Sequence, residues 1–261
     1  MIAVPYAITD SATMLRRNLR RMRRYPTVLY QAGIPIFFLL LFVFVLGGTL
    51  GAGLGGSRSR ADYIAYLTPG ILLMTVAGGA TGTAIAVAMD MTEGIIARFR
   101  TMAISRASVL AGHVIANVLQ AILAVVIVIG VAALIGFRPT TGPVEWLAAA
   151  GLLTLIAIAI TWLGVALGMV ARDVGSASNL PLPLLLLPFF GSGFVPTDSM
   201  PDLLRQFAEY QPFTPMIETL RGLLLGTPIG GSGVIAVAWC IAITIVGYLW
   251  AMRLYNRDPA H

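Results

Sequence analysis

The sequence predicts an all-α polytopic membrane protein with six transmembrane helices. Of its 261 residues, 58% are hydrophobic and only 11% are charged, whereas about a quarter of an average soluble domain is charged. The mean hydropathy is +0.88. This excess of apolar surface has to face lipid, which excludes an ordinary soluble enzyme and a disordered chain. A disulfide scaffold is excluded as well, because Cys240 is the single cysteine.

Five apolar segments are long enough to cross a bilayer, whose core of about 30 Å requires about 20 helical residues. None of the five contains Asp, Glu or Arg. A sixth segment is shorter and contains three prolines. We interpret it as a kinked span, because neighbouring helices can satisfy the backbone groups that proline frees. The expected spans are residues 27–48, 64–89, 108–137, 146–170, 179–195 and 233–252.

The arginines orient these spans, because positive residues concentrate on the cytoplasmic side of a membrane. With both termini inside, the inner segments hold twelve arginines and five acidic residues, and the outer segments hold five arginines and six acidic residues. The net charge is therefore +7 inside and −1 outside. We expect a multi-pass protein of the cell (inner or plasma) membrane with cytoplasmic termini. The net positive charge of the chain reflects this orientation in the membrane, and we expect no nucleic-acid partner.

All 17 basic residues are arginine, and lysine is absent. A P-loop requires a lysine, so any ATP that the protein uses has to be bound by another chain. Two histidines and one cysteine, far apart in the sequence, make no metal site. We therefore expect no catalytic residues, no metal and no cofactor in this chain.

Residues 1–26 precede the first span, and we expect them to form an amphipathic helix on the inner membrane surface. Apolar residues from Ile8 to Met22 recur at spacings of three and four, which places them on one helical face. Arginines occupy the other faces, as in helices that bind anionic membrane surfaces. A lipid anchor and a docking site for a cytosolic partner both remain open as roles. The arginines are Arg16, Arg17, Arg20, Arg21, Arg23 and Arg24.

The inner segment 90–106 lies between the second and third spans. Ile95, Phe99 and Met102 share a helical face, and charged residues surround that face. A short amphipathic helix held between two membrane helices suits a lever that a cytosolic partner can grip.

The runs Glu-Gly-Ile-Ile, Arg-Phe-Arg-Thr and Ile-Ser-Arg within this segment resemble the cytoplasmic loop of type-2 ABC exporter permeases, and most closely the daunorubicin-resistance permease group. The resemblance covers nearly the whole chain, including the glycine- and proline-rich run 191–215. It implies a coupling helix that fits a groove on a separate ATPase subunit. Ala103 departs from the family pattern, where proline is frequent. The expected coupling residues are Glu93, Gly94, Arg98, Phe99, Arg100, Thr101 and Arg106, together with Asp90 just before them.

The resemblance also implies partners. ATP and Mg would be bound by the ATPase subunit, and two permease chains, identical or paralogous, would pair with two ATPase chains. The remaining partner is the lipid bilayer itself.

The resemblance further implies that residues 196–232 form short helices that re-enter the outer leaflet before the last span. Ser199 is a candidate cap for the first of them. Glu218 and Arg221 lie on the second, which is otherwise apolar. Two roles remain open for these short helices: they close the outer end of a transport pathway, or they lie at the membrane interface without a gating role.

Polar residues also occur along the third span, where His113, Asn117 and Gln120 follow helical spacing. Such side chains face other helices or a cavity. Two roles therefore remain open for them: helix packing and lining of a transport pathway. The same two roles are open for Phe189 and Phe190 in the kinked span. The pairs Gly78 with Gly82 and Gly164 with Gly168 predict close helix contacts, without indicating which helices meet.

We expect a permease subunit of an ATP-driven exporter. The low internal charge indicates an amphipathic or apolar substrate, and the resemblance favours efflux of drugs or antibiotics. Export of a lipid or lipid-linked glycan is the alternative within the same class. An ATP-independent carrier would need ionisable residues inside the spans for ion coupling, and the absence of Asp, Glu and Arg from the five long segments counts against a carrier. An intramembrane enzyme would need a base beside Ser192, and His113 is expected near the opposite membrane surface.

Overall fold

The computed structural model describes residues 27–47, 60–94 and 106–256, which fold into helices joined by short turns. Within these ranges, five helices are long and apolar enough to cross a membrane, which confirms an all-helical, multi-pass membrane protein. The first continues from an α-helical into a π-helical part. They are α2 (Thr27–Leu40) with η1 (Leu41–Leu46), α4 (Arg60–Thr92), α6 (Arg106–Ile135), α7 (Pro143–Val170) and α12 (Ser232–Asn256).

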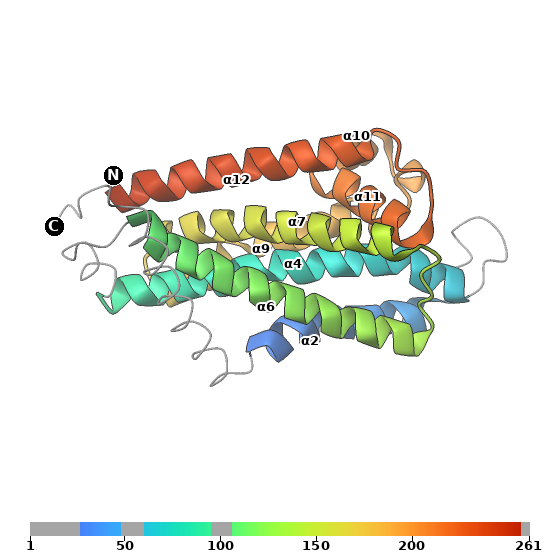
Figure 1. Cartoon of the computed structure of the whole chain (residues 1–261), viewed down its shortest axis with the longest axis horizontal. Coiled ribbons are helices and arrows are strands. Elements are labelled where there is room, and N and C mark those ends of the chain that lie inside the picture. Colours follow the sequence, from blue (N-terminus) through green and yellow to red (C-terminus); the bar gives the residue numbers. More distant parts are fainter. Residues whose placement is uncertain (1–26, 48–59, 95–105, 257–261) are drawn as a thin grey trace.

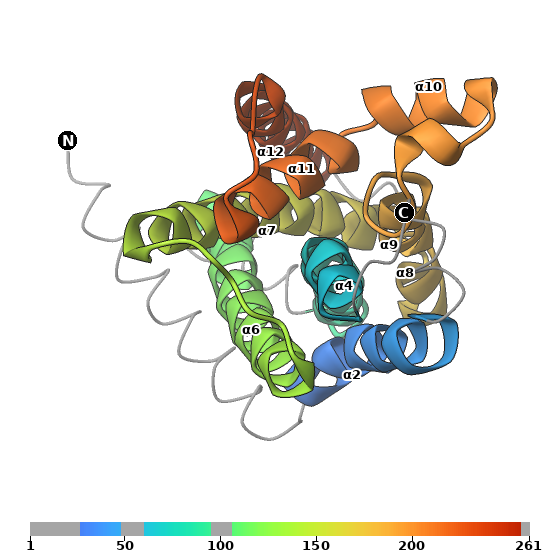
Figure 2. The same ribbon diagram turned by 90° about the vertical axis from the view of Figure 1, so that its right-hand side faces the viewer.

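Helix α4 is the centre of the bundle. It packs against α2, α6, α7, α8 (Val174–Asn179) and α11 (Phe213–Leu225), and Figure 2 shows these neighbours arranged around it. Twenty of its 33 residues are buried. Helix α12 lies outside this ring, against α7 and α11 (Figure 1). A displacement of α4 therefore acts on almost every other helix.

The expected sixth span is not one continuous helix. The chain runs through α8, α9 (Leu182–Leu186) and η2 (Leu187–Phe190), a broken apolar stretch shorter than the five spanning helices. Prolines 181, 183 and 188 accompany the breaks, because proline removes a backbone donor. The segment begins at Val174, earlier than expected, and residues 179–195 as a membrane span remain a prediction.

A capping box explains this early start. The Asp173 carboxylate accepts a hydrogen bond from the Ser176 backbone N–H at 2.6 Å, and the Ser176 hydroxyl accepts one from the Asp173 N–H at 3.1 Å. The hydrogen bond from the Ser176 backbone lowers the pKa of Asp173 below its ordinary value.

One end of the bundle is covered by η3 (Thr197–Ser199), α10 (Asp202–Tyr210) and α11, which Figure 1 shows on the right. The expected cap at Ser199 is wrong. Pro201 occupies the N-cap position of α10 without a side-chain bond, and the Ser199 hydroxyl donates to the Pro196 carbonyl at 2.7 Å. Helix α11 ends at Gly226, whose φ of 72° is the left-handed geometry that glycine adopts at helix ends.

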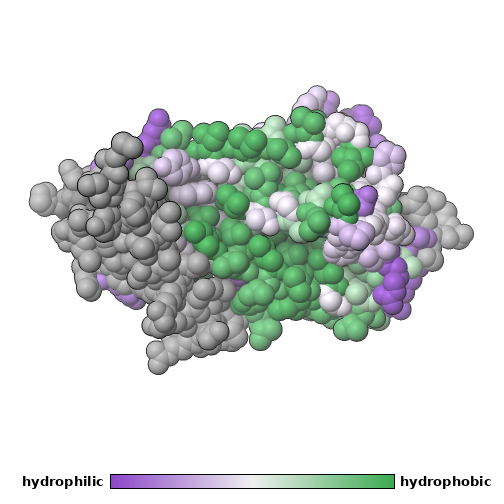
Figure 3. Space-filling view, viewed as in Figure 1, coloured by the Kyte–Doolittle hydropathy of each residue, from purple (hydrophilic) through white to green (hydrophobic). Residues whose placement is uncertain are grey.

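The outer surface of the bundle matches a lipid environment. In Figure 3 the middle of the visible face is hydrophobic, and the hydrophilic residues lie toward its ends. Large apolar side chains point outward from α2, α6 and α12, among them Phe37, Leu123 and Val246, which are 61%, 51% and 60% exposed. Because such exposure is unfavourable in water, the bilayer is the solvent that this surface requires.

Candidate functional site

An acid and a histidine meet in the buried interior, beside the expected coupling segment. Asp90 lies in the last turn of α4, and His113 lies near the start of α6. The Oδ2 atom of Asp90 is 3.2 Å from Nε2 of His113, and the two side chains are 2% and 5% exposed. A buried carboxylate needs such a partner, because its desolvation is unfavourable by several kcal/mol. The pair joins α4 and α6, the two helices that residues 95–105 connect along the chain.

This position differs from the sequence expectation for Asp90 in two respects. Helix α4 continues to Thr92, so Asp90 belongs to the helix and its side chain is buried among its neighbours. An ionisable group therefore does lie inside one of the long helices, because α4 extends beyond the expected boundary at residue 89. This buried carboxylate removes one reason to disfavour an ATP-independent carrier.

Glu93 and Gly94 form the exit from α4. Glu93 is exposed, and the Gly94 N–H donates to the Met91 carbonyl at 3.1 Å. The φ of Gly94 is +68°, in the left-handed region that favours glycine. Gly94 thus ends the helix and sets the direction of the following segment, while the carboxylate of Glu93 stays available to solvent or a partner.

The other predicted residues of the inner membrane side lie wholly or partly outside the described part of the chain. Arg106 begins α6, but its side chain is outside the description. The remaining coupling and anchor residues lie outside the described ranges and stay predictions: Arg98, Phe99, Arg100, Thr101, Arg16, Arg17, Arg20, Arg21, Arg23 and Arg24.

A chain of amide hydrogen bonds crosses the bundle. The Gln120 side chain of α6 donates to Oε1 of Gln31 at 3.0 Å, and Gln31 of α2 donates to the Thr75 carbonyl of α4 at 3.1 Å. Asn117 donates to the carbonyl of His113 on its own helix at 2.9 Å. The contact with Gln31 supports a packing role for Gln120, and the contact with Asp90 supports one for His113, because each bridges two helices in apolar surroundings.

The glycine pair on α7 marks a close contact between two helices. A Cβ on Gly164 would lie 2.8 Å from the Ala80 carbonyl oxygen of α4, and one on Gly168 would lie 2.6 Å from that of Ala84. Both distances are too short for any side chain, so glycine is required at both positions. The predicted close contact is confirmed for this pair and is assigned to α7 against α4. The other pair, Gly78 and Gly82, has side-chain neighbours only at 3.9 Å.

Phe189 belongs to an aromatic cluster that links the kinked segment to α2 and η1. Its ring stacks on Phe194 at a centroid distance of 4.3 Å and meets Phe38 edge-on at 5.4 Å. Phe42 approaches Phe194 at 5.1 Å. Phe190 is instead 46% exposed. The two neighbouring phenylalanines thus face different surroundings, and only Phe189 is held between elements.

At the opposite end of α4, Arg221 forms a polar knot with Tyr66 and Ser192. Its Nη2 donates to the Ser192 carbonyl at 2.6 Å, and its guanidinium lies 4.1 Å from the centroid of the Tyr66 ring. The Tyr66 hydroxyl donates to the same carbonyl at 2.9 Å. Burial lowers the pKa of Arg221 below its ordinary value. An arginine in a short apolar helix is thereby held on α4.

The backbone reinforces this knot. A Cβ on Gly70 would lie 2.7 Å from the Gly193 carbonyl oxygen, so the loop that contains Ser192 rests directly on the backbone of α4. The knot therefore connects α11, the loop after η2 and α4 in one place.

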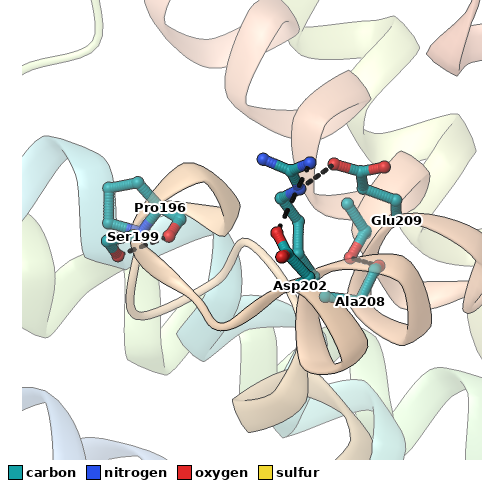
Figure 4. A network of polar contacts seen from close by, with 7 residues as sticks. Pro196, Ser199, Asp202, Ala208 and Glu209 are labelled. Carbon is teal, nitrogen blue, oxygen red and sulfur yellow. Dashed lines mark hydrogen bonds and ion pairs between the residues drawn. The ribbon is translucent and has the colours of Figure 1, made fainter.

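Glu218 lies on α11 and accepts a hydrogen bond from the Ser232 hydroxyl at 2.9 Å, which joins α11 to the first turn of α12. Helix α10 is more loosely held. Its Arg205 lies 4.0 Å from Asp202 and 3.7 Å from Glu209 (Figure 4). These are exposed pairs of the kind that contribute about 0–1 kcal/mol.

Sequence reasoning missed several of these residues. Gln31, Tyr66 and Phe194 each contact a predicted residue, but each lies in a different element from its partner. One signal was available: an arginine within an apolar helix requires a partner, and a tyrosine can supply both a ring and a hydroxyl. Which tyrosine it would be depends on the packing.

The chain matches the family model of ABC-2 type transporters over residues 10–225. It is 26% identical over 259 residues to the daunorubicin resistance ABC transporter permease protein DrrB1 of Streptomyces coeruleorubidus, covering 98% of this chain and 89% of the relative. It is 25% identical over 252 residues to the probable doxorubicin resistance ABC transporter permease protein DrrC of Mycobacterium tuberculosis, covering 95% and 90%. It is 29% identical over 220 residues to nodulation protein J of Rhizobium leguminosarum bv. viciae, covering 80% and 81%. The chain therefore belongs to the ABC-2 type transporter family and is a type-2 ABC permease.

Proposed function

We propose that this permease is the moving subunit of an ATP-driven exporter whose ATPase is a separate chain, and that it exports drugs, antibiotics or similar amphipathic compounds. The family membership and the resistance named for two relatives support this proposal. The absence of lysine supports a separate ATPase, because a P-loop in this chain would lack its phosphate-binding residue.

The contact between Asp90 and His113 is the observation that carries the mechanism. The expected coupling segment leaves α4 at Gly94 and enters α6 at Arg106. The pair ties these two helices together at 3.2 Å. A force applied by the ATPase to residues 90–106 would then move α4 and α6 as one body instead of separating them.

Helix α4 provides the route across the membrane. Asp90 and Tyr66 are 24 residues apart on one helix, which corresponds to about 36 Å. The knot of Tyr66, Ser192 and Arg221 would pass the movement of α4 to α11 and to the loop after η2. In this proposal residues 196–232 re-enter the outer leaflet and close the outer end of the pathway, with 179–195 as the kinked sixth span and both termini cytoplasmic.

Two such permeases, identical or paralogous, would assemble with two ATPase subunits that bind ATP and Mg. Export of a lipid or lipid-linked glycan by the same machinery is the alternative substrate class.

An ATP-independent carrier is the second candidate, and one observation favours it. Asp90 and His113 are buried ionisable groups at the end of a spanning helix, as ion-coupled transport requires. Their contact with each other supports a structural role, which is why the exporter is preferred.

Reconstitution into liposomes separates the two candidates. The permease would be tested alone and with its ATPase partner, using accumulation of a fluorescent anthracycline inside the liposomes. Transport that requires both the ATPase and ATP supports the exporter. Equal transport by the permease alone, driven by an ion gradient, would establish the carrier.

A further inference from the structure

An apolar cavity of about 200 Å³ lies between α6 and α7, with α4 behind it. Small side chains create this space, because Ala121 of α6 and Ala149, Ala150 and Ala157 of α7 all line it. Larger aliphatic side chains complete the wall. The cavity is a feature of the helix packing and is separate from both the Asp90–His113 pair and the Arg221 knot.

The chemistry of the lining excludes most ligands. Among the residues that the structure describes, and apart from the indole of Trp146, Thr154 supplies the only polar side chain of the wall. Its hydroxyl already donates to the Ala150 carbonyl at 2.7 Å. Sites for drug-like compounds contain a few polar groups that fix orientation. A cavity without them stays dry and accepts hydrocarbon, as an apolar cavity of about 150 Å³ accepts benzene.

The position of the cavity indicates the source of the hydrocarbon. Val126 on its rim is 60% exposed, and Ala150 is exposed as well, on the face of two spanning helices that meets lipid. Along α7 the lining runs from Trp146 to Ala157, a rise of about 16 Å. An elongated slot of this length follows the direction of a lipid chain in the adjacent leaflet.

We propose that this cavity binds one acyl chain of a bilayer lipid, which inserts between α6 and α7 from the end where α7 begins. The acyl chain fills the space that the alanines leave open. Helices α6 and α7 therefore stay apart here without an empty cavity between them. This site does not depend on the proposed transport function.

Fluorescence quenching by brominated lipid tests the site in the full-length chain. Trp162, Trp239 and Trp250 are replaced by Phe, so that Trp146 is the only fluorophore, and the protein is reconstituted in phosphatidylcholine with increasing fractions of phosphatidylcholine brominated in its acyl chains. A second variant, in which all four tryptophans are replaced by Phe and Ile241 of α12, 50% exposed, is replaced by Trp, reports ordinary contact with surrounding lipid.

A specific site predicts that Trp146 reaches half-maximal quenching at about a tenfold lower fraction of brominated lipid than the Ile241→Trp variant, which corresponds to a preference of about 1.4 kcal/mol. Ala150→Phe should remove this difference by filling the cavity, and Ala150→Leu serves if the larger residue prevents folding. Ala148→Phe, on the exposed face of the same helix, should preserve it. Coincident curves for Trp146 and the Ile241→Trp variant, or an equal effect of Ala148→Phe, would overturn the proposal.

Discussion

Asp90 of α4 and His113 of α6 lie 3.2 Å apart, with both side chains almost fully buried. Together with Gly94, this contact sets how the chain leaves α4 for the expected coupling segment. The two helices are thereby joined twice, by the covalent connection through residues 95–105 and by the side-chain contact. Segments joined in this way move together more readily than segments joined by a loop alone.

Removing one member of this pair should destabilise the protein. Asp90→Ala leaves the buried imidazole of His113 without its carboxylate partner, and an unsatisfied buried polar group is unfavourable by about 1–3 kcal/mol. We expect a lower thermal midpoint in detergent and weaker stimulation of the ATPase. Asp90→Asn, which retains a hydrogen-bonding side chain, should have the smaller effect on both.

The exchanged variant Asp90→His with His113→Asp is the control for this prediction. It restores an acid–histidine contact in the opposite orientation, so it should recover part of the stability and of the ATPase stimulation. If Asp90→Ala behaves like the unmodified protein in both measurements, the pair does not hold α4 and α6 together.

Glycine substitutions on α7 should have opposite effects depending on the face. Gly168→Ala introduces a Cβ that would lie 2.6 Å from the Ala84 carbonyl oxygen, so α7 must move away from α4 and the thermal midpoint should fall. Gly151→Ala introduces a Cβ with no neighbour within 4 Å, and alanine favours a helix by up to about 1 kcal/mol over glycine. Comparable midpoints for the two variants would show that the contact between α4 and α7 is looser than described.

Arginines on α10 and α11 should also differ in importance. Arg221→Met removes both the hydrogen bond to Ser192 and the contact with the Tyr66 ring, so we expect destabilisation of about 1.5–3 kcal/mol, the range for hydrogen bonds to charged groups. Arg205→Met removes only exposed pairs at 3.7 Å and 4.0 Å and should leave the unfolding midpoint unchanged. Combining Arg221→Met with Tyr66→Phe should cost less than the sum of the single changes, because both act on one carbonyl.

Cysteine labelling tests the orientation of the spans. In a Cys240→Ser background, a cysteine in place of Arg58 should react with an impermeant maleimide in intact cells. One in place of Arg100 should react only after the membrane is opened. The reverse pattern would mean that the arginine distribution orients this protein differently from most membrane proteins.

The sequence predicts much of the fold because the bilayer imposes a simple rule. A long apolar run must be helical in lipid. The bounds of five expected spans therefore agree within a few residues with the helices α2 with η1, α4, α6, α7 and α12. The glycine pair on α7 correctly indicates a close contact between helices. The kinked segment is harder, because proline shows where a helix breaks but not whether the pieces cross the membrane.

The candidate site is less predictable, because it depends on which helices meet. His113 and Asp90 are 23 residues apart, and Tyr66 and Arg221 are 155 apart. A polar residue in an apolar helix indicates that a partner exists, and only the packing identifies it. Asp90 is expected on the coupling surface because the sequence places the end of its span at residue 89, whereas α4 continues to Thr92.

ATP hydrolysis by the reconstituted complex tests the central claim most directly, since the proposal requires force to enter through residues 90–106. Glu93→Ala and Arg98→Glu would be compared with the unmodified permease, each in liposomes with the ATPase, after confirming equal insertion. We predict that both variants lose permease-dependent stimulation of the ATPase and ATP-driven transport together. Unchanged stimulation and transport in both variants would contradict the claim that this segment couples the permease to an ATPase.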